Sequence, residues 1–220
     1  MSETGLKIAL PDGSAVSAIW TEAKPASGLA FVYAPGAGSS LKDAFGDYAA
    51  AALAERGIGS LRFQFPYSEA GRKLPDKPPL LEATWRAAIE VARARGKRLV
   101  VGGRSMGGRI ASQVVAGGEA VDALALFAYP LHPPGRPDQR RDAHLTKIEA
   151  PVLFCSGDRD TFALVEELEG LTAMLPRARP WVLAGADHGF AVLKASGRKR
   201  EDVWQEAIEA LLGFVKEELG

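Results

Sequence analysis

The sequence predicts an α/β fold in which helices cover both faces of a mainly parallel, twisted sheet, with an antiparallel hairpin at its N-terminal side. Short apolar runs alternate along the chain with segments whose apolar residues recur every three or four positions, which is typical of strand–helix alternation. Glycine or proline separates most of these segments. A glycine-rich turn at residues 103–107 joins one apolar run to a helical segment, which also favours a parallel sheet.

The N-terminal elements begin with the hairpin. Residues 6–10 and 15–21 have strand-like composition and flank a turn that contains Asp12-Gly13, so we expect these two segments to pair. Their successors alternate between buried-strand and helical patterns. The elements expected here are strands at 29–34 and 58–65, with a helix over 45–56 between them.

The remaining two thirds of the chain continue this alternation. Residues 66–79 are polar and rich in proline, and we expect a surface connection there. The last helical segment, residues 204–215, has the clearest amphipathic pattern in the chain. The other elements expected are strands at 99–102, 123–129, 151–155 and 181–184, and helices at 81–95, 108–115 and 164–175.

Composition limits the class of protein. A chain of 220 residues, 47% of them hydrophobic, can build one domain with a substantial core, so we expect residues 1–220 to form a single domain. Lys plus Arg and Asp plus Glu number 27 each, and this balance gives no long-range attraction to nucleic acid or to an anionic membrane. The single cysteine excludes an intramolecular disulfide.

Several segments bear on location and cofactors. Residues 1–6 lack the basic start and apolar run of a signal peptide, and no apolar stretch approaches the roughly 20 residues of a membrane span. We therefore expect a cytoplasmic protein with no membrane or nucleic-acid partner. The glycine-rich segments 36–41 and 103–108 lack the further residues of nucleotide-binding loops, and zinc motifs are absent, so we expect no cofactor and no metal.

The most informative motif is Gly-x-Ser-x-Gly, formed by Gly103, Ser105 and Gly107 between the strand at 99–102 and the helix that follows. This context is that of a nucleophile elbow. The chain reverses so tightly there that a side chain at either flanking position would strike the neighbouring backbone, and glycine avoids this contact. The serine hydroxyl is left at a helix N-terminus, where backbone amides stabilise negative charge.

A nucleophilic serine needs a base and an acid that orients it. Asp158 and Asp160 follow the strand at 151–155, at the edge where open α/β sheets place their sites. His188 is the one histidine beyond these acids, and it directly follows the strand at 181–184. In strand–helix proteins with this elbow the chain order is Ser, acid, His, so His188 is the candidate base. Either aspartate fits by position, and spacing alone does not separate them.

Segments 33–38, 103–109, 127–135 and 157–162 together resemble the α/β-hydrolase family, and the resemblance covers nearly the whole chain. The first segment is similar to the family's oxyanion loop, although Pro35 stands where the family often has histidine. The other three are most similar to a branch of small, dienelactone-hydrolase-like proteins. That branch includes bacterial hydrolase-like proteins, the testis-expressed protein thirty and the third subunit of the NSL histone-acetylation complex.

The resemblance implies an α/β-hydrolase fold and assigns several roles. It places the acid at Asp160, the last residue of Gly-x-x-Asp, and it implies that the backbone N–H groups of Ala37 and Met106 form an oxyanion hole. In this fold a lid would be inserted near residues 130–147, and that segment is too short for a helical cap domain. We therefore expect an open site with no large lid.

Substrate contacts are expected from charged residues near the motif. Arg104 and Arg109 flank the elbow and Arg159 lies beside the acid, so they could favour a substrate with a carboxylate or phosphate. The alternative is that they are solvated or paired with nearby acids. His132 and His144, in the segment that follows the strand at 123–129, are further candidates, against the alternative of ordinary loop histidines.

The sequence thus predicts a serine hydrolase that transfers an acyl group to water through Ser105, Asp160 and His188, with a small-molecule acyl substrate. The simplest form is a carboxylesterase acting on small or medium acyl groups. The alternatives are a non-catalytic interaction module that retains the fold, or a thioesterase, peptidase or lactonase. The acyl and leaving groups and the oligomeric state are left open by the sequence.

Overall fold

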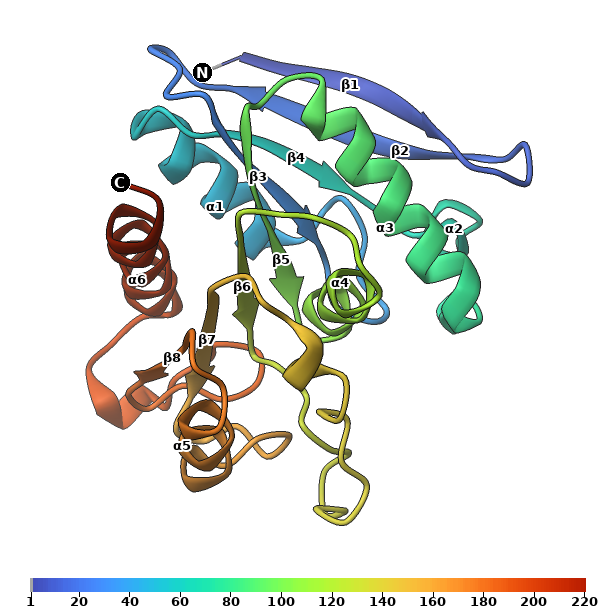
Figure 1. The fold of residues 1–220 in the computed structure, drawn as a ribbon. Helices are drawn as coiled ribbons and strands as arrows, with labels where there is room; N and C mark the ends of the chain where they lie inside the picture. The colour runs from blue at the N-terminus through green and yellow to red at the C-terminus, as the bar shows by residue number, and fades with distance from the viewer. Residues whose placement is uncertain (1) are drawn as a thin grey trace.

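The computed structural model describes residues 2–220, and its eight strands form one sheet in the order β1-β2-β4-β3-β5-β6-β7-β8 (Figure 1). Only the pairs β1–β2 and β2–β4 are antiparallel among the strand pairs of these residues, and the other five are parallel. The predicted mainly parallel sheet with an N-terminal hairpin is confirmed. The strands are β1 (Ser2–Ala9), β2 (Ala15–Glu22), β3 (Leu29–Ala34), β4 (Gly59–Phe63), β5 (Arg98–Arg104), β6 (Ala123–Phe127), β7 (Val152–Gly157) and β8 (Ala178–Leu183).

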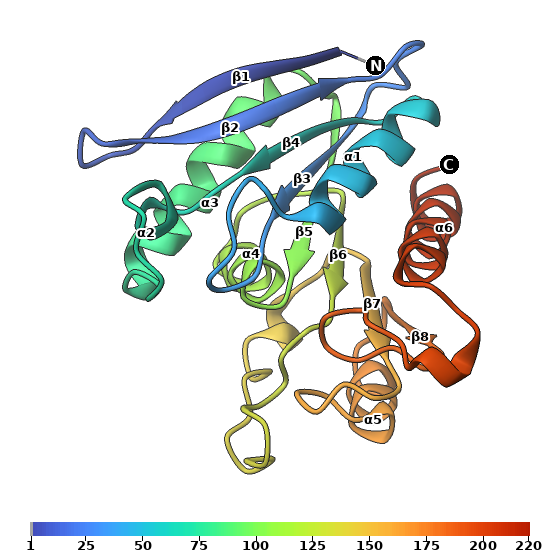
Figure 2. The ribbon, with the colours of Figure 1, turned by 180° about the vertical axis from the view of Figure 1, so that it is seen from behind.

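Helices cover both faces of this sheet (Figures 1 and 2). The apolar side chains of α1 and α6 join one buried cluster, and those of α3, α4 and α5 join a second cluster on the opposite face. The hydrophobic core is therefore split by the sheet into two layers. The helices are α1 (Ala44–Glu55), α2 (Pro66–Glu69), α3 (Pro78–Arg93), α4 (Met106–Ala116), α5 (Val165–Ala173) and α6 (Arg200–Leu219), with short 3-10 turns at η1 (Leu145–Lys147) and η2 (Lys194–Ser196).

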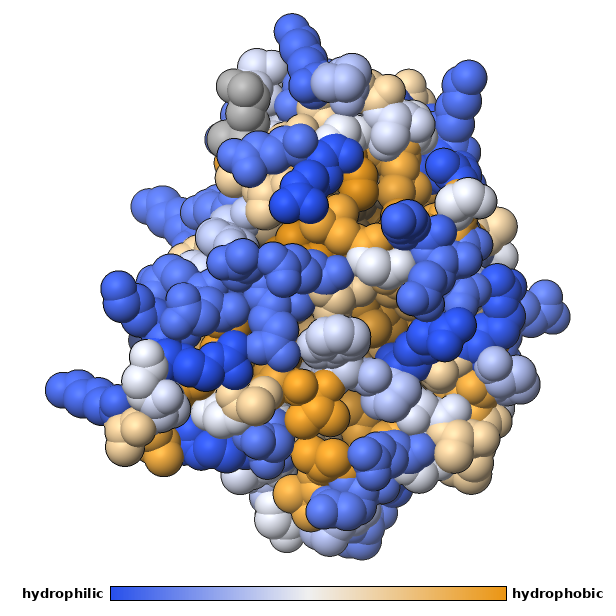
Figure 3. Space-filling model, turned by 90° about the vertical axis from the view of Figure 1, so that its left-hand side faces the viewer, coloured by the Kyte–Doolittle hydropathy of each residue, from blue (hydrophilic) through white to orange (hydrophobic). Residues whose placement is uncertain are grey.

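Local sequence explains where these elements begin and how they face. Asp43 caps α1, because its carboxylate accepts the Gly46 N–H at 3.1 Å. Pro78 opens α3 at a position where its missing N–H costs nothing. On α6, the buried positions are apolar and the exposed ones are mostly charged. Figure 3 views the α1 and α6 side of the molecule, where hydrophilic side chains surround smaller hydrophobic patches.

The segment 66–79 differs from the expected surface connection. It contains the short helix α2, and the side chain of Tyr67, a residue of that helix, is fully buried. Pro66 at the first helical position starts this turn. The expectation was wrong for Tyr67 because a single aromatic residue in a polar stretch gives no periodic pattern, and its burial depends on contacts that are remote in sequence.

The carboxyl ends of the parallel strands lie along one edge of the sheet, and the loops that leave this edge hold the candidate site (Figure 1). The segment 130–147 also leaves from this edge, after β6, and its only helical element is the three-residue turn η1. The expected lack of a large lid at this point is confirmed. Among residues 2–220, no helix combines the length and the apolar character needed to cross a lipid bilayer.

Candidate active site

Ser105 lies in a strained turn between β5 and α4. Its φ of 52° and ψ of −119° fall where a residue with a side chain rarely lies. A Cβ atom on Gly103 or on Gly107 would come within 2.2 Å of the carbonyl oxygen of Ala34, at the end of β3. The steric reason inferred from the motif therefore holds: the two glycines let the turn pack directly against the neighbouring strand.

Buried hydrogen bonds fix this turn from both sides. The Ser105 N–H donates to the carbonyl oxygen of Phe127 at 2.8 Å, which ties the turn to the end of β6. The indole N–H of Trp85, a fully buried residue of α3, donates to the carbonyl oxygen of Gly107 at 3.1 Å. The backbone around the serine is thus held by both neighbouring strands and by a helix.

His188 and Asp160 complete a hydrogen-bonded row with Ser105. The Nε2 atom of His188 lies 2.9 Å from Ser105 Oγ, and its Nδ1 atom lies 2.8 and 3.0 Å from the two carboxylate oxygens of Asp160. The side chain of Asp160 is fully buried, and that of His188 is 24% exposed. Because the carboxylate accepts the proton on Nδ1, the Nε2 lone pair faces the serine hydroxyl.

The two candidate acids have different surroundings. Asp158 is exposed and accepts the N–H of Gly185 at 2.8 Å, so its carboxylate joins the loops that follow β7 and β8. Asp160 instead turns inward to His188. The two aspartates that spacing did not separate therefore have different contacts: Asp158 supports a turn, and Asp160 contacts the imidazole.

Close packing between the two loops brings the acid and the histidine together. A Cβ atom on Gly157, at the end of β7, would lie 2.0 Å from the carbonyl oxygen of Ala186. Asp187 accepts the N–H groups of Gly189 and Ala191 at 2.8 and 2.9 Å and so shapes the turn that carries the histidine. These backbone contacts fix the position from which His188 reaches Ser105.

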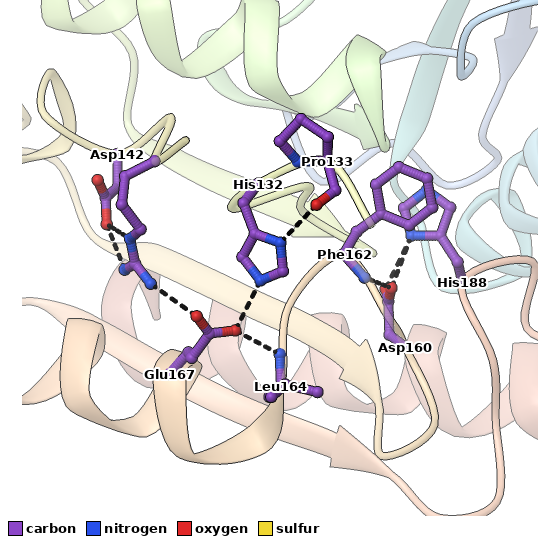
Figure 4. A network of polar contacts seen from close by, with 9 residues as sticks. His132, Pro133, Asp142, Asp160, Phe162, Leu164, Glu167 and His188 are labelled. Atoms are coloured by element: carbon purple, nitrogen blue, oxygen red, sulfur yellow. Dashed lines mark hydrogen bonds and ion pairs between the residues drawn. The ribbon is translucent and has the colours of Figure 1, made fainter. Parts of the chain in front are cut away.

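Phe162 contributes to the same arrangement, and the sequence assigned it no role. Its ring stacks on the imidazole of His188 with the ring centres 4.0 Å apart (Figure 4). Its backbone N–H donates to Asp160 Oδ1 at 2.8 Å. One residue therefore supports the flat face of the histidine and one oxygen of the acid.

A cavity of about 470 Å³ opens above the serine. Ala37 and Met106, the expected oxyanion residues, both line it. Gly36 of the same loop approaches closely, since a Cβ atom there would lie 3.5 Å from the Cβ of Ser105. The hydroxyl of Tyr67 accepts the N–H of Gly38 at 3.2 Å and so braces this loop, a role that sequence reasoning missed.

His132 lies apart from the row, in a second polar network (Figure 4). It is only 3% exposed, and its two ring nitrogens lie 2.8 Å from the carbonyl oxygen of Pro133 and from a carboxylate oxygen of Glu167. Burial lowers the pKa of His132, but these two acceptors outweigh it and the net pKa is raised. Glu167 also accepts from Arg140 at 3.1 Å. The network ties segment 130–147 to α5.

The structure places neither of the two candidate substrate-contacting histidines at the cavity. Of the described residues, His132 and His144 are not among those that line the cavity. His144 instead lies 2.8 Å from Ser112 Oγ, on the second turn of α4. Both histidines lie in the loop segment where the sequence places them, but His132 is bound to Pro133 and Glu167, and His144 lies against the buried Ser112.

The arginines divide into paired and unpaired groups. Arg104 lines the cavity and pairs with Asp43 at 3.2 Å. Arg159 is exposed and donates to the carbonyl oxygen of Gly185 at 3.0 Å. Arg109 lines the cavity, and so does Arg141, which the sequence did not single out. Arg140 and Arg141 form a basic pair in segment 130–147, but the sequence does not show which of them reaches the cavity, because that depends on how the loop folds back.

Solved structures with the same architecture include proteins that are described as serine hydrolases or esterases. An α/β serine hydrolase homologue from Coxiella burnetii is 20% identical, with a TM-score of 0.77 over 96% of this chain and 98% of that one. A lidless α/β serine hydrolase from Xanthomonas campestris is 20% identical, with a TM-score of 0.75 over 97% and 95%. An esterase domain from Rhodothermus marinus is 15% identical, with a TM-score of 0.75 over the full length of both chains. At these identities the likeness concerns the fold, which is that of the α/β hydrolases.

The sequence itself gives the family. A family model described as an alpha/beta hydrolase domain matches residues 27–216. The chain belongs to the α/β-hydrolase family, and the predicted fold is confirmed.

Proposed function

We propose that the chain is a serine hydrolase that transfers an acyl group to water, with Ser105 as nucleophile, His188 as general base and Asp160 as the acid that orients it. The observation that carries this proposal is the continuous row of hydrogen bonds from Ser105 Oγ through His188 to the buried Asp160. Such a row is what activates a hydroxyl that is otherwise a weak nucleophile at neutral pH.

In the proposed first half-reaction, Ser105 Oγ attacks the carbonyl carbon of an ester while His188 Nε2 takes the hydroxyl proton. Asp160 keeps the second proton on Nδ1 and stabilises the imidazolium. Ala37 and Met106 line the cavity, and their backbone N–H groups would donate to the oxyanion. Each such donor is typically worth about 2.7–4 kcal/mol in the transition state. The imidazolium then gives its proton to the departing alkoxide.

In the second half-reaction, water attacks the acyl-enzyme along the reverse proton path. His188 takes a proton from water, the hydroxide oxygen bonds to the acyl carbon, and the proton returns to Ser105 as the acid departs. The simplest activity is that of a carboxylesterase on small or medium acyl groups, supported by a cavity of about 470 Å³ that has no cap domain above it. The motifs at 103–109, 127–135 and 157–162 support placement in the branch of small hydrolases named above.

A fluorophosphonate probe tests this proposal, because it reacts only with an activated serine. We expect wild-type protein to be labelled at Ser105 and to hydrolyse 4-nitrophenyl acetate, and Ser105→Ala to do neither. Ser112→Ala is the matched control, since Ser112 also lies within hydrogen-bond distance of a histidine, and it should label like wild type. Well-folded wild type that takes no label would favour the interaction-module alternative.

A further inference from the structure

Two arginines, Arg109 and Arg141, line the cavity beside Ser105. Among residues 2–220, the guanidinium groups of Arg109 and Arg141 form no ion pair and donate no hydrogen bond, although both side chains are partly buried. The third arginine of the cavity, Arg104, has its carboxylate partner in Asp43. The two groups come from different elements: Arg109 lies one turn beyond Ser105 on α4, and Arg141 lies in segment 130–147.

Two acids of this region, Asp142 and Asp160, are already engaged by other side chains. Asp142, the neighbour of Arg141, accepts two hydrogen bonds from Arg140, and Asp160 is held by His188. Burial and the like charge of Arg141 both lower the pKa of Arg109, while the nearby Tyr129 acts in the opposite direction. Two partly desolvated cations that form no ion pair with the described residues are costly unless a ligand brings the negative charge.

The hydrogen-bonding capacity of the pair defines what that ligand is. A guanidinium presents its N–H groups in a planar fork that matches the oxygens of a carboxylate or a phosphate. Both arginines line the same cavity as Ser105 and the proposed oxyanion residues Ala37 and Met106. A ligand held there would have its anionic group and its ester carbonyl in one molecule of modest size.

Resting on the proposed function, we infer that Arg109 and Arg141 bind an anionic oxyacid group of the substrate, a carboxylate or a phosphate, and that the chain hydrolyses esters that carry such a group. This assigns substrate selection to two side chains outside the Ser105–His188–Asp160 row. It also gives segment 130–147 a function at the site through Arg141.

Matched esters test the inference. On the acyl side, 4-nitrophenyl hydrogen adipate is compared with 4-nitrophenyl methyl adipate. On the leaving-group side, the butanoate esters of 4-hydroxybenzoate and of 4-hydroxyphenyl phosphate are compared with that of methyl 4-hydroxybenzoate. We expect kcat/KM for at least one anionic ester to exceed that of its neutral counterpart by about tenfold or more, as befits a charge-assisted hydrogen bond. The comparison in which the anionic ester is preferred identifies the anion and the side of the ester that carries it.

Variants assign this preference to the two arginines. Arg109→Gln and Arg141→Gln should each lower the anionic-to-neutral ratio toward one. Arg136→Gln is the matched control, because Arg136 is exposed on the same segment and does not line the cavity, and it should retain the wild-type ratio. If Arg109→Gln does not fold, Arg141→Gln alone decides, since it lies outside the strands and helices.

The outcomes separate the two proposals. Wild type that labels with fluorophosphonate but hydrolyses neutral esters as fast as anionic ones would overturn this inference and leave the proposed function standing. A preference that survives both arginine variants would also overturn it. Wild type that neither labels nor hydrolyses any of these esters would overturn both.

Discussion

Two serine–histidine pairs flank helix α4, and they differ in what contacts the second nitrogen of each histidine. Ser105 and His188 lie 2.9 Å apart at its N-terminus, and Ser112 and His144 lie 2.8 Å apart two turns further on. The distances are nearly equal, so distance does not distinguish the pairs. The difference lies in where each proton points and in what stands behind each imidazole.

At the second pair the serine hydroxyl does not donate its proton to the histidine. The Ser112 hydroxyl donates to the carbonyl oxygen of Arg109 at 2.8 Å, so its single proton is already used. His144 must then donate its own Nε2 proton to Ser112 and cannot take one from it. Ser112 is also fully buried, whereas Ser105 lines an open cavity. A short serine–histidine distance therefore does not by itself make the histidine a base for the serine. A buried carboxylate that fixes the tautomer of the histidine is the more informative feature.

The largest effect should come from removing that carboxylate. Asp160→Asn leaves the shape but no longer holds the proton on Nδ1 of His188, so we expect turnover of 4-nitrophenyl acetate to fall by about 10⁴-fold. Asp158→Asn is the matched control, because Asp158 contacts only a backbone N–H in the neighbouring loop, and its turnover should stay within about threefold of wild type. The reverse ranking of the two variants would show that the acid is misassigned.

The next largest effect is a loss of stability at the tight turn that carries Ser105. Ser112 lies inside a helix and is not carried on such a turn. In Gly107→Ala the new Cβ would lie 2.2 and 2.6 Å from two backbone carbonyl oxygens, which have no room to move. We expect the free energy of unfolding in urea to fall by about 3 kcal/mol or more. In Gly213→Ala, on α6, the Cβ meets nothing within 4 Å, and stability should rise by up to about 1 kcal/mol. Equal stabilities would contradict the steric account of the elbow.

The smallest effect is a pH dependence that belongs to the second pair. Burial, followed by the positive charge of Arg109, lowers the pKa of His144 to about 4. The unfolded chain takes up this proton near pH 6.5 and the folded chain does not, so the contribution of His144 is complete above about pH 6.5 and is lost as the pH falls toward 4. In urea denaturation, the stability advantage of wild type over His144→Gln should therefore be smaller at pH 5 than at pH 7.

His132 provides the control of opposite sign. Its pKa is raised in the folded state, so its contribution is complete below about pH 6.5 and is lost as the pH rises through the raised value. The advantage of wild type over His132→Gln should consequently be larger at pH 6 than at pH 8. A common trend in the two variants would mean that the pH effect is global and does not arise from these two rings.

The sequence predicted those parts of the molecule that depend on local rules. The sheet and its covering helices follow from the spacing of apolar residues and from the glycines and prolines between segments. The turn at Ser105 follows from two glycines at positions where the adjacent backbone leaves no room for a side chain. His188 could be chosen because one histidine follows both acids. In each case a pattern within a few residues carries the information.

The side chains that support the site could not be found in this way. Tyr67 braces the loop at 36–38 from a helix that lies some thirty residues further along the chain, and Phe162 stacks on a ring 26 positions away. Arg141 reaches the cavity only because its segment folds back over the sheet edge. Such contacts depend on packing between residues that are distant in the sequence, and the local spacing of residues does not reveal them.

Residues 134–140 are exposed and belong to no strand or helix, yet they lie within the segment that brings Arg141 to the cavity. Insertions between these positions would leave the ladders of the sheet intact, because loop tips of this kind tolerate added length. A longer loop could cover the opening, and a different loop sequence could change its charge, without altering Ser105, His188 or Asp160. Residues 134–140 are therefore positions at which the choice of substrate could change with little effect on the stability of the fold.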